Sequence, residues 1–165
     1  VGIHHAYANG LLEHTVSVAA CAKAQAEAML ASGYDVDPDI AVAGALLHDI
    51  GKLAAYKFVT IPEITVEGAL IDHIAEGYRI FMDLAERHGL SEKTKLHIAH
   101  IILSHHGSRE FGSPVVPASP EAMIVSSADE LDFRMYCWSD SVKSLTDEQP
   151  ISPYHAITQR RFWKK

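Results

Sequence analysis

The sequence predicts an all-α fold, a single-domain bundle of five or more helices over residues 1–165. Apolar residues recur at intervals of three and four almost throughout, and the alternation typical of a half-buried strand never reaches a useful length. Capping residues, prolines and glycines also divide the chain into segments of helical length. Apolar residues make up 48% of the chain, which is enough for one substantial core.

The first two helices are set by glycine and proline signals. The first is expected over residues 9–31, ended by Gly33. Its predicted apolar face consists of Leu11, Leu12, Val16, Val18 and Ala19. The second is expected over residues 37–50, because an aspartate cap followed by proline opens a helix. Gly51 is placed to end it in a left-handed turn.

Three further helices follow. The third is expected over residues 67–88, and the fourth over residues 91–105 with a serine cap. Residues 107–120 contain two glycines and three prolines, which indicates a long irregular loop of the kind that often carries function. A serine-proline pair opens the fifth helix, over residues 119–145, and the remainder is expected to be a tail.

Charge is unevenly distributed along the chain. The net charge is −7, yet residues 1–159 carry 10 basic against 21 acidic side chains. Four basic residues close the chain: Arg160, Arg161, Lys164 and Lys165. The acidic body lacks the electrostatic pattern of a free-standing nucleic-acid binder. The basic tail could contact phosphates or another subunit, or it could be a solvated terminus.

The sequence favours a reduced, cytoplasmic setting without a membrane partner. No run approaches the ~18 apolar residues of a membrane helix, and no charged-then-apolar leader is visible. The two cysteines, Cys21 and Cys137, are too few for a disulfide framework and are expected to be buried thiols. Nothing in the sequence fixes the oligomeric state.

Polar residues with metal-binding chemistry stand on helical stripes or at helix ends. His48-Asp49 closes the second helix, and His105-His106 closes the fourth. Elsewhere the polar residue shares its stripe with apolar neighbours: His14 with Leu11 and Val18, His73 with Leu70, Gly77 and Ile80, and Asp129 with Val125 and Phe133. A lone histidine on such a stripe is usually a core residue. Because several helices each deliver such a group, metal binding is the better interpretation.

The ligand set points to two divalent transition-metal ions. Five imidazoles and two carboxylates without a thiolate favour Mn²⁺ or Fe, with Zn²⁺, Co²⁺ and Ni²⁺ as alternatives. A carboxylate can bridge two ions ~3.5–4 Å apart, which together lower the pKa of a water. Lys52, one turn beyond Asp49, could neutralise a phosphate oxygen as negative charge develops; the alternative is a plain surface lysine.

The order His14, His48-Asp49 and Asp129 resembles the signature of the HD-domain metal-dependent phosphohydrolases. The added His73 and His105-His106 resemble the branch of this superfamily with two metals. The resemblance implies that His14, His48, Asp49 and Asp129 hold the first metal. It also implies that Asp49 bridges to a second metal, held by His73, His105 and His106.

The match is closer to the catalytic domain of YhaM-type 3′→5′ exoribonucleases. It covers nearly the whole chain from about His4 and rests on these stretches: "HHAYANGLLEHTVSVA", "GALLHDIGK", "EGALIDHI", "LSHHGSREFGSPVVPASPEA", "DELDFRM" and "RRFWKK". Such enzymes carry an oligonucleotide-binding barrel ahead of this domain. Two interpretations follow, a piece of such an enzyme or a relative with other substrates.

Three hypotheses for function remain. The first is a phosphodiesterase that releases nucleotides from an RNA 3′ end, using Asp49 and Lys52 in catalysis. The second is hydrolysis of a small nucleotide or dinucleoside polyphosphate, which the acidic body favours. The third is a regulatory or binding module, which predicts missing ligands, although none of the seven is missing. Arg109, His4 and His5 are candidates for contact with substrate phosphate.

Overall fold

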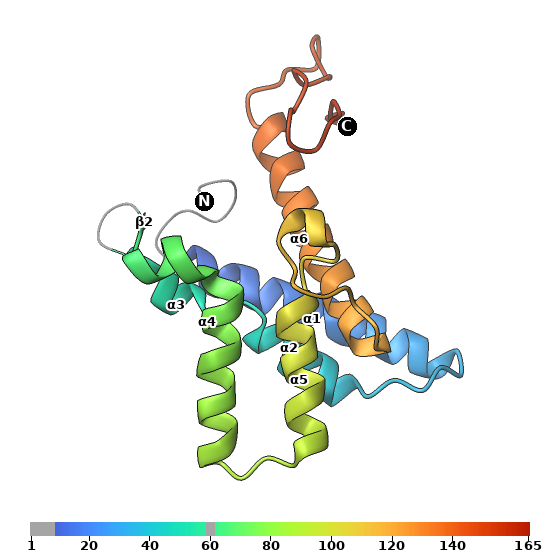
Figure 1. Ribbon diagram of the computed structural model, residues 1–165. Coiled ribbons are helices and arrows are strands. Elements are labelled where there is room, and N and C mark those ends of the chain that lie inside the picture. Colours follow the sequence, from blue (N-terminus) through green and yellow to red (C-terminus); the bar gives the residue numbers. More distant parts are fainter. Residues whose placement is uncertain (1–8, 59–61) are drawn as a thin grey trace.

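The computed structural model describes residues 9–58 and 62–165 and confirms the predicted helical bundle (Figure 1). Its elements are, in chain order, α1 (Gly10–Ala31), α2 (Pro38–Leu47), α3 (Lys52–Ala55), β1 (Tyr56–Phe58), β2 (Pro62–Ile64), α4 (Val66–Arg87), α5 (Glu92–Ser104), the 3₁₀ turn η1 (Arg109–Phe111) and α6 (Pro120–Val142). The five long helices agree with the predicted ones to within three residues at each end.

Side-chain caps fix where the helices begin. Asp37 accepts hydrogen bonds from the amides of Asp39 and Ile40 at the start of α2, as predicted. Ser91 caps α5 and Ser119 caps α6 in the same way. These caps satisfy amide groups that the first helical turn leaves without partners.

A small hairpin stands between α3 and α4, where the sequence analysis predicted no strand. β1 and β2 pair antiparallel, with Tyr56 opposite Ile64 and Phe58 opposite Pro62. Each strand has three residues, which is too short to produce a recognisable alternation of apolar and polar side chains. The hairpin places the start of α4 beside α3.

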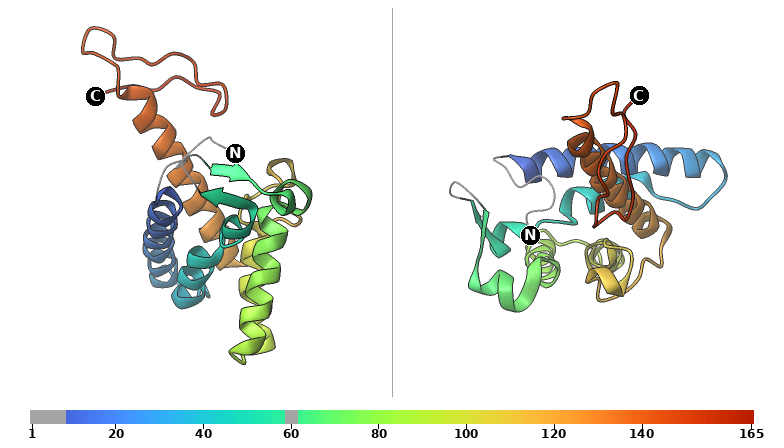
Figure 2. Two further views of the ribbon diagram at one scale, coloured as in Figure 1. Left: turned by 90° about the vertical axis from the view of Figure 1, so that its left-hand side faces the viewer. Right: turned by 90° about the horizontal axis from the view of Figure 1, so that it is seen from above.

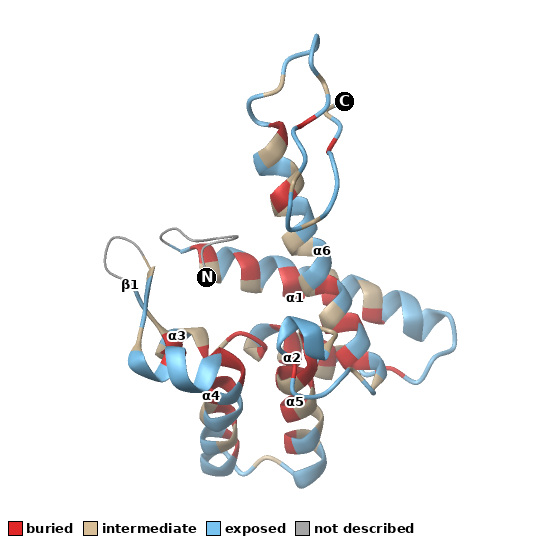
Figure 3. Ribbon diagram, turned by 45° about the horizontal axis from the view of Figure 1, so that its top comes forward, coloured by how far each residue is buried: buried red, intermediate tan, exposed pale blue. Residues whose placement is uncertain are grey.

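The helices form a bundle around a core of small and β-branched side chains. α1 packs against α2 and α6, and α4 and α5 run side by side in opposite directions (Figures 1 and 2). The main cluster of buried residues joins α1, α2, α5 and α6: Val18, Ala19, Ala22, Ala26, Val36, Ala41, Ala45, Ile101, Ala122, Ile124, Val125 and Ala128. Figure 3 shows the buried residues lining the inward faces of these helices.

Part of the predicted apolar face of the first helix is wrong. Leu12 and Val16 are 64% and 56% exposed, whereas Val18 and Ala19 are buried as expected. The buried face continues instead through Ala22 and Ala26. Alanines dominate because α1 lies close against α2, so a small side chain fills the available space.

Gly51 does not end α2 in a left-handed turn, because its φ is −65°. A Cβ at this position would lie 1.8 Å from the carbonyl oxygen of His73 and 2.4 Å from the amide nitrogen of Gly77. Glycine is therefore required here by the close approach of the backbone of α4, not by an unusual dihedral angle. The contact sets the distance between the end of α2 and the start of α4.

The C-terminal residues are folded rather than a solvated tail. α6 extends beyond the bundle, and the residues after it fold back along its last turns (Figure 2). The amide of Ser152 donates to the carbonyl of Phe162 (2.8 Å), and that of His155 donates to the carbonyl of Arg160 (2.8 Å). Phe162 is buried against Cys137 and Val142.

None of the helices in the described part of the chain combines the length and apolar character needed to cross a membrane.

Candidate metal centre

The seven residues predicted as metal ligands lie together at one end of the bundle. They come from three long helices and from the turns that follow two others: His14 from α1, His48 and Asp49 after α2, His73 from α4, His105 and His106 after α5, and Asp129 from α6. All are buried or half-buried. A group of imidazoles and carboxylates gathered this way is costly without compensating charge or hydrogen bonds.

The first group of ligand atoms surrounds one oxygen of Asp49. The Oδ2 atom of Asp49 lies 3.4 Å from Nε2 of His14 and 3.5 Å from Nε2 of His48. The two Nε2 atoms are 3.1 Å apart. Asp129 Oδ1 completes the group, at 3.2 Å from His14 Nε2 and 3.9 Å from His48 Nε2. His14, His48 and Asp49 can bring one ligand atom each within 4.8 Å of the others, so these three residues are able to hold a metal ion.

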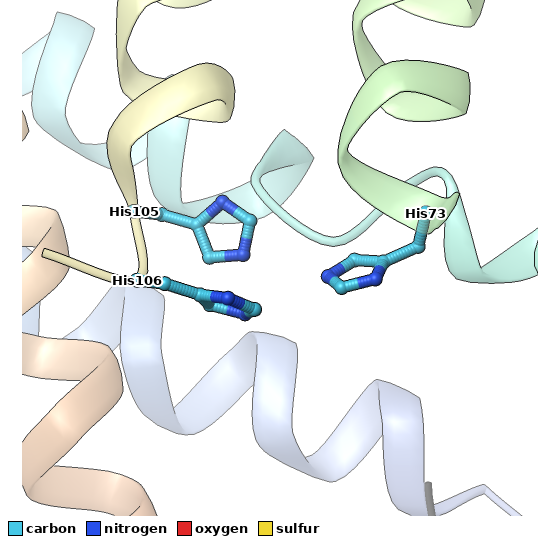
Figure 4. Close-up of side chains that lie close together, drawn as sticks. All are labelled: His73, His105 and His106. Carbon is cyan, nitrogen blue, oxygen red and sulfur yellow. The ribbon is translucent and has the colours of Figure 1, made fainter. Parts of the chain in front are cut away.

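The second group faces the other oxygen of the same carboxylate. Oδ1 of Asp49 lies 3.5 Å from Nε2 of His73 and 3.6 Å from Nε2 of His105. Figure 4 shows His73 from α4 pointing toward His105 and His106 from the end of α5. These three histidines can bring one ligand nitrogen each within 4.8 Å of the others, so they are also able to hold an ion. The Asp49 carboxylate thus lies between two groups of ligands.

Hydrogen bonds at Nδ1 turn each imidazole so that Nε2 faces inward. His48, His105 and His106 each place Nδ1 2.7 Å from a backbone carbonyl oxygen, those of Ala45, Ile102 and Phe111 respectively. His14 and His73 place Nδ1 against carboxylates, Asp132 at 2.7 Å and Asp72 at 2.6 Å. In a neutral imidazole whose Nδ1–H donates to an oxygen, Nε2 keeps its lone pair, as metal-binding histidines require.

Three buried atoms of the centre have no hydrogen-bond partner in the described part of the chain: Asp49 Oδ1, His73 Nε2 and His105 Nε2. All three are electron-pair donors that face one another across the second group. Buried polar atoms are rarely left without a partner, since this costs ~1–3 kcal/mol each. A divalent cation bound among them would satisfy all three at once, so the residues present fit a metal ion.

The pKa shifts of Asp49 and His14 show that the carboxylates of the centre attract positive charge. Burial raises the pKa of Asp49, but the charges of Lys52 and His48 outweigh it and hold this pKa well below its usual value. Burial opposes the charged form of His14, yet hydrogen bonds to Asp129, Asp132 and Asp49 raise its pKa to about 11. In the metal-free protein a proton on His14 therefore supplies part of the charge that an ion would otherwise provide.

Lys52 is more than a surface lysine. Its ammonium Nζ lies 2.5 Å from Oδ2 of Asp49, and its side chain is only 23% exposed. Burial lowers the pKa of Lys52, but the negative charge of Asp49 raises it above its ordinary value. The side chain is therefore charged and lies beside the first group of ligands.

Sequence reasoning missed two carboxylates that orient ligands. Asp132 follows Asp129 by three residues on α6, so helical spacing could have revealed that both share one face. Asp72 could not be found in this way, because its φ of 69° and ψ of 157° interrupt α4. That kink brings its Oδ1 to the amide (2.5 Å) and the Nδ1 (2.6 Å) of His73.

The kink also explains why Leu70 does not share a buried stripe with His73, as had been expected. Leu70 is 80% exposed. The helical spacing of three residues no longer applies across the non-helical Asp72.

Of the three residues predicted to contact substrate phosphate, only Arg109 lies in the described part of the chain. Arg109 is exposed on η1, and no hydrogen bond or ion pair joins its side chain to a ligand residue in the described part of the chain. The turn it belongs to nevertheless serves the centre, because the carbonyl of Phe111 accepts from His106. His4 and His5 lie outside the described residues.

A known family model matches the part of the chain that contains all seven candidate ligands. The family model described as "HD domain" matches residues 11–134. The chain belongs to the HD-domain family. This confirms the resemblance to HD-domain phosphohydrolases and the enzyme class predicted from the sequence, and the buried histidines and aspartates form the cluster expected of that class.

Several curated relatives are named as 3′-5′ exoribonucleases. The chain is 33% identical over 161 residues to the 3′-5′ exoribonuclease YhaM of Bacillus subtilis (strain 168), a match that covers 98% of this chain and 50% of that protein. It is 32% identical to the proteins of that name from Bacillus pumilus (strain SAFR-032) and Geobacillus sp. (strain WCH70). The chain spans about half the length of these relatives. No solved structure matches it.

Proposed function

We propose that this HD domain is a two-metal phosphodiesterase that releases nucleotides from the 3′ end of RNA. The observation that carries the proposal is the Asp49 carboxylate, whose two oxygens face separate groups of ligand atoms. His14, His48 and Asp129 would hold one ion with Asp49, and His73, His105 and His106 would hold the other. Mn²⁺ or Fe²⁺ fits this imidazole and carboxylate set.

When bound, two divalent ions supply the positive charge that acidifies an attacking water and offsets negative charge on a phosphate oxygen. The protein contributes fixed geometry. Nδ1 hydrogen bonds hold the imidazoles in place before the substrate arrives. Lys52 donates from Nζ to Asp49 and is close enough to the first group of ligands to donate to a substrate phosphate oxygen as its charge grows.

RNA is proposed as the substrate because the relatives named above are 3′-5′ exoribonucleases, and because the match extends over 98% of this chain. A small nucleotide or dinucleoside polyphosphate is the second candidate. The charge of the bundle favours it, since residues 1–132 carry eight basic against 18 acidic side chains. A long polyanion would be repelled by such a surface unless other residues compensate.

The test is turnover by the metal-loaded chain on matched substrates. A ten-nucleotide RNA, the same DNA sequence, a dinucleoside polyphosphate and a mononucleotide would be compared with Mn²⁺, using a 5′ label to reveal the direction of shortening. The proposal expects stepwise shortening of the RNA from its 3′ end. The isosteric Asp49→Asn variant is the control for a contaminating nuclease, since it keeps the size of the side chain and should be inactive.

Two other results would contradict the proposal. Faster hydrolysis of the dinucleoside polyphosphate than of RNA would favour the second candidate. A fully metal-loaded chain that hydrolyses none of the four substrates would refute a catalytic role and favour a binding module.

A further inference from the structure

The last part of the chain forms a separate folded unit that adds nothing to the bundle core. Residues 133–165, termed the C-terminal arm, comprise the end of α6 and the segment that folds back along it. The arm has its own cluster of buried and half-buried apolar side chains: Phe133, Cys137, Trp138, Val142, Leu145 and Phe162. Because the C-terminal arm does not contribute to the bundle core, we consider a separate function for it.

The charge of the arm is opposite to that of the bundle. Residues 133–165 carry six basic and three acidic side chains, in contrast to the acidic surplus of residues 1–132. Arg160, Arg161 and Lys165 are exposed, and none of them forms an ion pair with a carboxylate in the described part of the chain. Exposed cations without acidic partners form a favourable surface for a polyanion.

Exposed aromatic rings accompany these cations. Trp163 and Tyr154 are 57% and 58% exposed, although both belong to the folded segment. The backbone of Trp163 is fixed, because its carbonyl accepts from Trp138 Nε1 (3.0 Å) and it pairs with Ile151 across an antiparallel bridge. Aromatic rings beside cations are the combination that binds single-stranded nucleic acids, through base stacking and phosphate contacts.

The arm stands where a strand leading from the metal centre could reach it. α6 carries Asp129 and continues without a break to Val142, where the fold-back begins. Thirteen residues of helix span about 20 Å. The arm leaves the bundle at the end where α4 begins and α5 ends, which is the end that holds the centre (Figure 1). Trp163 lies nearer, beside Trp138, which is nine helical residues or about 14 Å from Asp129. At about 3.4 Å per stacked nucleotide, these distances correspond to about four to six nucleotides.

We propose that the C-terminal arm binds single-stranded RNA on the 5′ side of the nucleotide being cleaved. This inference rests on the proposed function for its orientation, because it places the 3′ end of the strand at the metal centre. Arg160, Arg161 and Lys165 contact phosphates, and the rings of Trp163 and Tyr154 stack on bases. The arm thereby supplies the compensation for the acidic bundle that a long RNA substrate needs.

The test measures binding directly, in a chelator that prevents cleavage. The full chain would be titrated into a ten-nucleotide fluorescent RNA and the anisotropy recorded at several salt concentrations. Arg160→Gln/Arg161→Gln/Lys165→Gln should weaken binding by tenfold or more and lower the slope of log K against log salt by about 2, since each phosphate contact on a single strand contributes about 0.7. Trp163→Ala should weaken binding about tenfold and leave the slope unchanged.

A matched variant controls for loss of charge alone. Lys23→Gln/Arg87→Gln/Lys93→Gln removes three exposed cations from α1, α4 and α5, and it should leave RNA binding unchanged. Substitutions are preferable to removal of the last six residues, because Phe162 is buried in the arm and its loss would unfold it. Circular dichroism of all variants should match that of the original chain.

Several outcomes would overturn the proposal. The arm does not bind RNA if both triple variants weaken binding equally, or if the arm variant binds as tightly as the original. A change of molecular mass by light scattering in the arm variants, without a change in RNA affinity, would instead assign the arm to contact with a second copy of the chain. Arm-dependent binding by a chain that hydrolyses no RNA would refute the proposed function and leave the arm proposal standing.

Discussion

Replacing Gly51 by alanine should disturb both the stability of the bundle and the second group of ligands. The added Cβ would lie 1.8 Å from the carbonyl oxygen of His73, whereas ordinary contacts begin at 3.4 Å. Both contacting groups at this point, the His73 carbonyl and the Gly77 amide, belong to the backbone of α4. No change of side-chain rotamer can therefore relieve the contact, and the backbone of α4 at His73 must move by about 1.6 Å.

The size of this displacement sets the expected magnitudes. Overpacking typically costs ~1–3 kcal/mol, and a rigid backbone contact places Gly51→Ala at or above the upper end of that range. His73 moves with the backbone of α4, which carries its Nε2 away from Asp49 Oδ1. A displacement of ~1 Å in an active site can lower the rate ~10²-fold, so turnover should fall by at least that factor.

Chemical denaturation with chelator, elemental analysis and turnover together measure these effects. Gly77→Ala is the matched control, because its Cβ would lie 3.3 Å from the Gly51 amide and 3.4 Å from Ile102. The higher helix propensity of alanine, worth ~0.5–1 kcal/mol, should offset that tight contact and leave a change within about 1 kcal/mol. A Gly51→Ala protein with the original stability and metal content would refute the assignment of this glycine to a close approach.

Four further results are expected. Metal-saturated protein should contain about two ions per chain by elemental analysis, and one ion or fewer would remove the two-metal proposal. Asp49→Asn should lose both ions, whereas His73→Ala should retain the one held by His14 and His48; equal metal content in the two variants would contradict a bridging Asp49. Lys52→Ala should lower kcat by ~10²-fold at unchanged metal content, and an unaltered kcat would exclude a role in the transition state. Metal-free protein should lose unfolding free energy as the pH falls from 7 to 5, as denaturation curves would reveal. Burial lowers the pKa of His73, His100 and His105 in the folded protein, that of His105 to about 3, so these groups bind more protons in the unfolded chain over this range. The raised pKa of His14 acts in the opposite direction, but its contribution changes less between pH 7 and 5 than that of His105 alone; a flat profile would contradict these shifts.

The sequence predicted the helices and the gathering of the seven ligands because both follow from local patterns. Helix boundaries depend on caps such as Asp37 and Ser91, which act on amides only two or three residues away. The ligands were predicted because several helices each place a histidine or aspartate on an apolar stripe or at a helix end, and because the order of these residues resembles that of the HD-domain family. Their binding of metal stays a prediction, although the structure brings the residues together.

The features that were missed depend on local backbone geometry or on contacts between distant segments, which the pattern of residue types does not reveal. Asp72 orients His73 only because the backbone leaves the helical region at that residue, which the apolar pattern of α4 does not reveal. Leu12 and Val16 were expected to be buried because helical spacing does not show which face a neighbour covers. The folded arm was missed for the same reason, since Phe162 is buried by Cys137 and Val142 on α6, which are 25 and 20 positions earlier in the chain.

Four of the five residues 48–52 carry different requirements, and this limits how far the segment can vary. His48 donates from Nδ1 to the carbonyl of Ala45, Asp49 faces both groups of ligands, and Lys52 pairs with Asp49. Gly51 must have no side chain. Since each of these four positions is subject to a different constraint, a substitution at one position cannot be compensated by a substitution at a neighbouring one. Saturation mutagenesis should therefore find a short interval where nearly every substitution is harmful, beside an α2 surface that accepts many.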